Sequence, residues 1–206
     1  MQDSIIVNYK MKEIDRFIQI KSNSLAPARG RLLISEPFMG DYYFGRSVIL
    51  LAEHNNEGSF GVIMNKPVTA TFNEVLKDFP EFDAPIYLGG PVEVDSLFYV
   101  HTKGEQLDGA TEIVKGLYWG GDIDALKELI LIKRIEPKDI RFFIGYSGWA
   151  ADQLSDELKK NSWVITQASK RLLFSIDPMM MWDNLLGKMG ETYKYWSKFP
   201  IDPNMN

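Results

Sequence analysis

Cysteine is absent from this chain of 206 residues, and histidine is almost as scarce, with only His54 and His101. The missing thiols exclude disulfides, zinc–thiolate sites, iron–sulfur clusters and cysteine nucleophiles. The two histidines do not have the paired spacing that is typical of metal ligands. A metal site joining them to Glu53 or Asp41 stays open only if folding brings these residues together. We therefore expect no metal and no cofactor.

The sequence also lacks a strong excess of one charge and any long apolar run. Its 23 Lys and Arg residues against 28 Asp and Glu residues give a net charge of −5. No basic arm stands out, which disfavours broad electrostatic binding to nucleic acid, although a local patch of Arg29, Arg31 and Arg46 stays open. No run approaches the roughly 20 apolar residues that span a bilayer, and the apolar residues 5–7 are too few for a signal peptide. We expect a cytoplasmic protein without membrane contact.

What is present is the composition of a packed globular domain. Hydrophobic residues make up 45% and aromatic residues 13% of the chain. A single domain of this size buries roughly 70% of its unfolded surface. Apolar patterns predict strands at residues 32–34, 48–52, 60–64, 86–88, 97–101, 112–119, 140–144, 163–165 and 172–174.

Capping signals predict where helices begin. Thr71 with Glu74 forms a capping-box pattern, Asp122 precedes a helical pattern, and Asp177–Pro178 begins the last helix, which Gly190 ends. Strands and helices follow one another without a regular β-α rhythm, which favours an α+β fold. The methionine-rich face at residues 179–189 is expected to pack on the domain's own sheet.

The segment Gly145–Trp149 (Gly-Tyr-Ser-Gly-Trp) is the most distinctive of the chain. An apolar run ends there at a glycine, and an amphipathic pattern extends from residue 150 to residue 160. We expect a helix to begin at Gly148. Because the first N–H groups of a helix have no partner within it, this turn predicts a place to hold an anion or a polar ligand.

Two known reaction centres fit this segment poorly. Gly145-x-Ser147 is similar to a hydrolase nucleophile elbow, but Trp149 stands at the second glycine and both histidines precede the serine. Ser147 is therefore expected to cap a helix or a turn. No Walker loop and no G-x-G-x-x-G pattern occurs. The Gly89–Pro91 and Gly120–Asp122 turns could bind an anion, although most such glycines are there only because the turn needs a backbone conformation that other residues disfavour.

Taken together, these stretches resemble the YqgE/AlgH family of bacterial proteins. The resemblance implies a single α+β domain with a mixed, bifurcated β-sheet surrounded by helices, cytoplasmic location and no assigned activity. The label "transcriptional regulator" used in this family says nothing about direct DNA contact. Ser147 departs from the alanine common there. The matching residues are 30–37, Asp41, Phe44, Ser47, Val48, His54, Asn55, Gly58, Gly61, 65–67, 89–92, His101, 120–122, 145–149, Gln153, Leu154, Glu157 and Trp163.

The resemblance also suggests domain boundaries. We expect an N-terminal extension at residues 1–24, with a short polar helix around residues 11–20, and the family domain at residues 25–190. Residues 191–206 then form a C-terminal aromatic tail. Docking of this tail on its own domain or on a second copy is favoured over stacking with single-stranded nucleic acid.

Three hypotheses for function remain. The first is a non-enzymatic binding or regulatory protein whose partner is an unknown protein or a small polar ligand. The second is an enzyme acting on a small anionic metabolite, with His54 as general base and Lys66 as electrostatic stabiliser. The third is direct DNA binding. The predicted ligand-binding residues are His54, Asn65, Lys66, Gly89, Gly90, Pro91, Gly148, Trp149 and Gln153.

Overall fold

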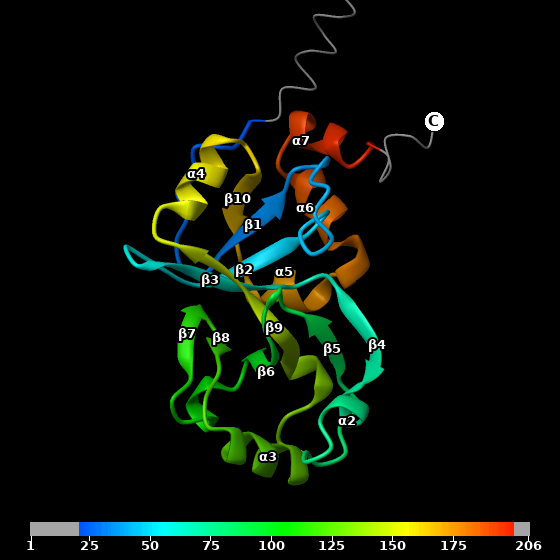
Figure 1. Ribbon diagram of the computed structural model, residues 1–206. Helices are drawn as coiled ribbons and strands as arrows, with labels where there is room; N and C mark the ends of the chain where they lie inside the picture. The colour runs from blue at the N-terminus through cyan, green and yellow to red at the C-terminus, as the bar shows by residue number, and fades with distance from the viewer. Residues whose placement is uncertain (1–20, 200–206) are drawn as a thin grey trace, which may run out of the picture.

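The computed structural model describes residues 21–199 (Figure 1). The helix predicted around residues 11–20 and the last seven residues of the predicted tail lie outside this range. The strands are β1 (Arg31–Ser35), β2 (Val48–Asn55), β3 (Gly58–Ile63), β4 (Pro67–Thr71), β5 (Pro85–Leu88), β6 (Val92–His101), β7 (Thr111–Val114), β8 (Leu117–Trp119), β9 (Ile140–Ala150) and β10 (Trp163–Gln167). The α-helices are α2 (Phe72–Val75), α3 (Ile123–Leu131), α4 (Gln153–Lys159), α5 (Lys170–Ser175), α6 (Met181–Lys188) and α7 (Glu191–Trp196).

Strand β9 joins the two halves of the sheet (Figure 1). Its C-terminal residues 147–150 pair with β3. This half of the sheet continues from β3 through β2 and β1 to β10. Its N-terminal residues 140–144 lie between antiparallel β6 and parallel β5. The sheet is therefore mixed and bifurcated, and the chain is α+β. The strand order is β10-β1-β2-β3-β9-β6-β8-β7, with β5 and β4 branching from β9.

Three glycines allow the backbones to meet where the sheet divides, which we call the fork (Gly89, Gly90 and Gly145). A Cβ atom on Gly89 would lie 2.0 Å from the Gly145 carbonyl oxygen, and one on Gly90 would lie 2.3 Å from the Tyr146 carbonyl. Gly145 itself has φ +68°, a conformation that other residues adopt at a cost. The Gly89 N–H donates to the Ile144 carbonyl at 2.8 Å. The glycines of the predicted Gly89–Pro91 turn thus serve to let the backbones approach closely at the fork.

The helices cover the sheet at both ends (Figure 1). Helix α6 buries Met181, Trp182 and Leu185 in the largest core cluster, so this part of the methionine-rich segment packs on its own sheet as predicted. Met179 and Met180, which precede the helix, are exposed instead. Trp196 of the predicted tail is fully buried in the same cluster. At the other end of the molecule, α2 and α3 pack with Phe142 and its neighbours in a second cluster. Within residues 21–199, no helix is long and apolar enough to cross a bilayer.

The prediction that a helix begins at Gly148 is wrong. Strand β9 continues through the whole Gly-Tyr-Ser-Gly-Trp segment to Ala150, because Ser147 and Gly148 pair with Gly61 and Phe60 of β3. Helix α4 begins only at Gln153, after Asp152 with φ +63°. Gly148 therefore offers no helix N-terminus.

Two further predictions need correction. Residues 172–174 belong to helix α5 and not to a strand, since Ser169 caps that helix by accepting the Leu172 N–H at 3.2 Å. The helix from Asp177 is not the last, because α7 follows Gly190. Strand β4 was not predicted, although proline at its first residue is tolerated in strands. The Asp122 cap is confirmed, with Oδ1 accepting the Ala125 N–H at 2.7 Å.

Substitution of Gly89 by alanine should therefore destabilise the protein. The new methyl group meets backbone on β9 that cannot move without opening the fork, so we expect the free energy of unfolding to fall by about 3 kcal/mol. Gly187→Ala is the matched control, because a Cβ atom there has open space on α6 and should raise stability by about 0.5–1 kcal/mol. Urea denaturation measures both; equal stability of the two variants would contradict the role assigned to the fork.

Candidate functional site

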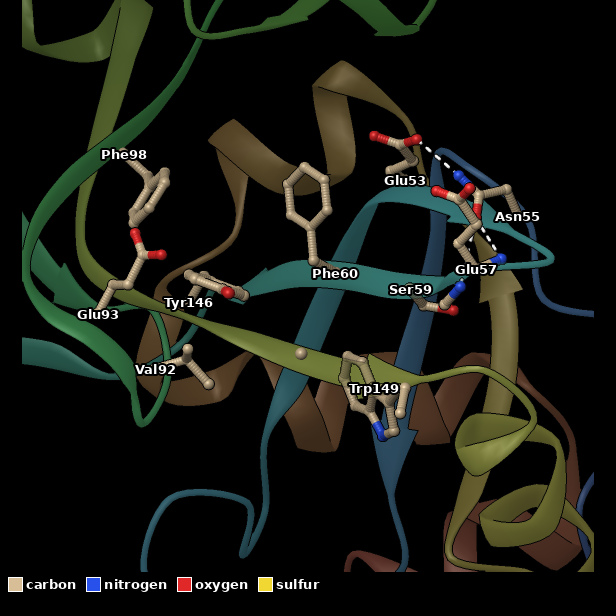
Figure 2. A pocket seen from close by; sticks show the side chains of 13 residues that line it. Glu53, Asn55, Glu57, Ser59, Phe60, Val92, Glu93, Phe98, Tyr146 and Trp149 are labelled. Carbon is tan, nitrogen blue, oxygen red and sulfur yellow. Dashed lines mark hydrogen bonds between the residues drawn. The ribbon is translucent and has the colours of Figure 1, made fainter.

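An open cavity of about 630 Å³ lies over β9, between the β2–β3 hairpin and the start of β6 (Figure 2). Every side chain that shapes it comes from strands or from the tight turn that joins β2 to β3. Strand pairing on both sides of β9 holds this backbone in place, so the cavity rests on a rigid base. Its lining combines aromatic rings with carboxylates.

A β-bulge in β2 sets which side chains face the cavity. The register of β2 against β3 shifts between Leu51 and Glu53, which places Glu53 opposite Phe60. Phe60 in turn lies opposite Gly148 of β9. Since cross-strand neighbours project to the same side of a sheet, Glu53 and Phe60 share the cavity face. A Cβ atom on Gly148 would lie 3.0 Å from the Tyr146 ring and 3.9 Å from the Val92 side chain, so glycine leaves room beside these two residues of the lining. The Phe60 ring is half-buried.

Three half-buried rings, Phe60, Phe98 and Tyr146, line the cavity, and the half-buried Trp119 ring contacts two of them from outside the lining. We call these four rings the aromatic wall. Tyr146 contacts Phe60 and Phe98 edge-on, with ring centroids 6.0 and 5.5 Å apart. Trp119 stacks on Phe98 at 5.7 Å with an interplanar angle of 25° and meets Phe60 at 5.5 Å. Phe98, Trp119 and Tyr146 pack against the largest core cluster, which fixes the wall from behind.

Three carboxylates border the cavity, and none of the lysines, arginines and histidines within residues 21–199 lines it. Glu53 accepts a hydrogen bond from the Asn55 side-chain amide at 2.8 Å. Among the described residues, Glu53, Glu57 and Glu93 form no ion pair. Their negative charge is therefore uncompensated within the site.

Glu93 has an unusual backbone. Its φ of +48° lies in the left-handed region, which costs a residue with a Cβ atom roughly 1 kcal/mol. Figure 2 shows the Glu93 carboxylate directed toward the Phe98 ring. No group of three or more acidic or histidine side chains within residues 21–199 is arranged to hold a metal ion. The three carboxylates are thus spread around the cavity and do not converge on one point.

Trp149 and Gln153 serve a different structure on the opposite side of β9, where Figure 2 shows the Trp149 side chain. One Glu157 carboxylate oxygen accepts the indole N–H groups of Trp149 at 2.8 Å and of Trp163 at 2.7 Å. Gln153 donates to the other oxygen at 3.0 Å and accepts the Ala150 N–H. We call this arrangement the indole clamp (Trp149, Gln153, Glu157 and Trp163). Glu157 was not among the predicted site residues, although it follows Gln153 by one helical turn.

His54 lies beside the indole clamp and outside the cavity. Its Nδ1 atom is 2.7 Å from the Ser59 hydroxyl oxygen, and Ser59 separates it from Trp149 by one strand. The imidazole is half-buried and does not line this cavity. The structure thus brings His54 and Trp149 near each other, with Ser59 of β3 between them.

Asn65 and Lys66 line a separate cavity of about 950 Å³ that has no residue in common with the first. Asn65 is fully engaged, since its Oδ1 accepts the Val48 N–H and its Nδ2 donates to the Arg46 carbonyl. The Lys66 ammonium donates to the Tyr42 carbonyl at 3.0 Å. Burial lowers the pKa of Lys66, while neighbouring Asp41 opposes part of that shift. The predicted site residues therefore separate. Gly148 and Trp149 line the first cavity, Asn65 and Lys66 line this one, and Gly89–Pro91 lie at or next to the fork. His54 and Gln153 line neither cavity.

His101, the other histidine, is a core residue. Its Nε2 donates to the Gly120 carbonyl at 2.7 Å and its Nδ1 accepts the Lys103 N–H at 3.2 Å. This pattern requires the neutral imidazole, because a protonated ring has no acceptor. Burial lowers the pKa of His101, with the Gly120 hydrogen bond opposing.

Comparison with known proteins places the chain in a defined group. A family model described as AlgH-like matches residues 32–194. A UPF0301 protein of Bacteroides fragilis is 46% identical over 189 residues, covering 91% of this chain and 96% of that protein. A UPF0301 protein of Chlorobaculum parvum is 41% identical over 177 residues, covering 86% and 95%.

Two solved structures share the fold. The solution structure of the AlgH protein from Pseudomonas aeruginosa has a TM-score of 0.67 and 28% identity, covering 87% of this chain and 98% of that chain. A crystal structure of a Corynebacterium diphtheriae protein has a TM-score of 0.71 and 24% identity, covering 89% and 97%. The printed names of these relatives state no activity.

Removing the Glu157 carboxylate should weaken the protein because two buried indole N–H groups lose their acceptor. We expect Glu157→Ala to lower the free energy of unfolding by about 2–3 kcal/mol. Glu157→Gln should cost less, since it keeps one carbonyl oxygen for one of the indoles. Denaturation followed by tryptophan fluorescence measures both. Asp156→Ala, on the exposed side of the same helix, is the control and should leave stability nearly unchanged.

The stability of the protein should fall on mild acidification because of His101. A folded-state pKa below the ordinary 6.5 means that the unfolded chain binds the proton first. The resulting loss of folding stability is absent above about pH 7. It grows as the pH falls toward about 5, by at most about 1.4 kcal/mol per pH unit. Denaturant titrations across this range should show a flatter profile for His101→Gln, although that variant is less stable at neutral pH. Parallel profiles for both proteins would contradict the assignment.

Proposed function

The chain belongs to the AlgH-like family, and from that premise we propose that it is a non-enzymatic binding protein that takes an organic cation in the cavity beside β9. One observation supports this proposal above all. Among the described residues, the cavity lining presents half-exposed aromatic rings together with three carboxylates and no basic side chain.

Each part of the lining favours positive charge. An ammonium or guanidinium group near the face of an aromatic ring gains about 0.5–2 kcal/mol, depending on how well it is shielded from water. The carboxylates add Coulombic attraction, which is strengthened beside the low-dielectric wall. Because the carboxylates are spread around the cavity, they suit a cation with a large, weakly hydrated surface better than a metal ion.

The same lining argues against the two alternatives. An anionic metabolite or a DNA phosphate would face Glu53, Glu57 and Glu93 without any cation to offset them. His54, the general base of the enzymatic alternative, lies outside this cavity with its Nδ1 at the Ser59 hydroxyl. Binding without catalysis is the function that accounts for the residues in the site.

Tetramethylammonium is the simplest probe of this proposal. It should bind in the millimolar range, shift the NMR signals of Tyr146 and Phe98, and bind more weakly as ionic strength rises. Glu53→Gln and Glu93→Gln should each weaken binding about three- to fivefold, as expected for the loss of roughly 0.5–1 kcal/mol per partly exposed charge. Glu128→Gln on the exposed side of α3 is the matched control.

Glu93→Gly separates recognition from folding. Glycine tolerates φ +48°, so stability should stay unchanged or rise by up to about 1 kcal/mol, while affinity for tetramethylammonium falls. If the full chain bound sulfate but not tetramethylammonium at tens of millimolar, the proposal would be overturned.

A further inference from the structure

We propose that the cavity of about 950 Å³ beside Lys66, which we call the loop cavity, binds an organic monocarboxylate with an apolar or aromatic body. Its lining comes from the loop between β1 and β2, the start of β4, the end of β5 and the segment that leads into α6. The loop cavity shares no lining residue with the cavity beside β9, so this inference does not depend on the proposed cation site.

Two half-buried cationic side chains, Arg46 and Lys66, line the loop cavity. Within residues 21–199, neither of them pairs with a carboxylate. The Lys66 ammonium has the Tyr42 carbonyl as its hydrogen-bond acceptor. Burial lowers the pKa of Lys66, and the charge of Asp41 offsets only part of that shift. Because a partly buried cation without a counter-ion loses hydration that nothing replaces, a bound carboxylate would stabilise it.

Arg46 gives a second and independent indication of a ligand. Its guanidinium lies over the Trp182 ring, with Cζ 4.9 Å from the ring centroid, and donates one N–H to the Phe199 carbonyl. Its Nε atom is buried and has no hydrogen-bond partner among the described residues. Its backbone has φ +51°, in the left-handed region that disfavours residues with a Cβ atom. Backbone strain and unmet hydrogen bonds of this kind concentrate at binding sites.

Two acidic residues, Asp41 and Asp183, also line the loop cavity and limit the charge of the ligand. One Asp41 oxygen accepts the N–H groups of Tyr43 and Phe44, at 2.8 and 2.9 Å, so this carboxylate shapes the loop. Asp183 lies in the first turn of α6, where the helix dipole favours an acidic side chain. With two charges of each sign, the lining suits one added negative charge better than the several charges of a phosphate ester or a nucleic acid.

The rest of the lining supplies apolar contact for the body of the ligand. Met39, Leu88 and Met179 line the loop cavity together with Trp182. Met179 is 67% exposed, and methionine side chains adapt readily to aromatic or aliphatic groups. A small inorganic anion would leave these side chains in water, whereas an apolar body attached to the carboxylate would cover them.

3-Phenylpropionate tests this inference on the full chain, in comparison with acetate, 3-phenylpropanol and free phenylalanine. We expect it to bind at least about tenfold more tightly than acetate, because its ring and methylene groups become buried. It should also bind more tightly than the alcohol, which lacks the charge, and than phenylalanine, whose ammonium group adds a cation beside Arg46 and Lys66. Calorimetric titration measures the affinities, and the indole signal of Trp182 reports the place of binding.

Lys66→Met removes the charge and keeps most of the side-chain length, so it should weaken binding of 3-phenylpropionate about tenfold. Lys66→Arg keeps the charge and should keep the affinity. Lys77→Met, at an exposed position outside the lining, is the matched control. Because the Lys66 ammonium also contacts the Tyr42 carbonyl, urea denaturation should accompany the titrations to show that each variant is folded.

The pH dependence of binding gives a readout that a purely structural role of Lys66 would not change. Affinity for 3-phenylpropionate should fall as the pH rises through the lowered pKa of Lys66, since the neutral amine no longer attracts the carboxylate. Lys66→Arg should abolish this dependence, because arginine stays charged throughout that range.

Met179 and Met180 offer a charge-matched pair of variants for the apolar part of the cavity. Both precede α6 and are exposed, but only Met179 is in the lining. Met179→Asp should weaken binding about fivefold, as expected for one nearby like charge, and Met180→Asp less than about twofold.

Several results would overturn the inference. Equal affinity in Lys66→Met and Lys77→Met would exclude Lys66 as the carboxylate partner, and equal binding of the alcohol would show apolar binding alone. Tighter binding of phenylalanine or of inorganic phosphate would assign the cavity to another class of ligand. Failure of 3-phenylpropionate to bind at tens of millimolar would overturn the inference whether or not tetramethylammonium binds beside β9, so the two proposals fail separately.

Discussion

The backbone contact at the fork is the constraint on which the rest of the molecule depends. Gly89 and Gly90 approach Gly145 and Tyr146 more closely than any side chain permits. This contact allows β9 to leave one set of neighbours and join another without a break in the strand. Both halves of the sheet, and the core clusters packed on them, take their positions from that crossing.

Alternation along β9 then divides one short segment between two tasks. Tyr146 and Gly148 face the cavity, while Trp149 points to the indole clamp on the other side. The features that make the Gly-Tyr-Ser-Gly-Trp segment conspicuous in the sequence therefore build mainly the frame. Tyr146, Gly148 and Trp149 of this segment also line the cavity.

Local signals in the sequence were sufficient for the fold class, for the strands at residues 48–52 and 60–64 and for the Asp122 cap, because each depends on residues close together in the chain. They failed at Gly148, where a glycine suggested a turn and the long-range pairing with β3 kept the backbone extended. The cavity was missed for the same reason. Its wall needs a bulge in β2 and rings from β3, β6, β8 and β9, and no periodicity within one segment indicates that they meet. The predicted domain boundaries stay predictions.

The position of the cavity gives the proposed function a mechanical consequence. Glu53 and Phe60 belong to the half of the sheet that contains β2 and β3, whereas Glu93 and Phe98 belong to β6 in the other half. A cation held between them contacts both halves on either side of β9. Since a ligand that binds only the folded arrangement stabilises it by mass action, occupancy opposes separation of the two halves at the fork. Under the proposed function, a bound cation therefore links the two halves of the sheet and stabilises their junction.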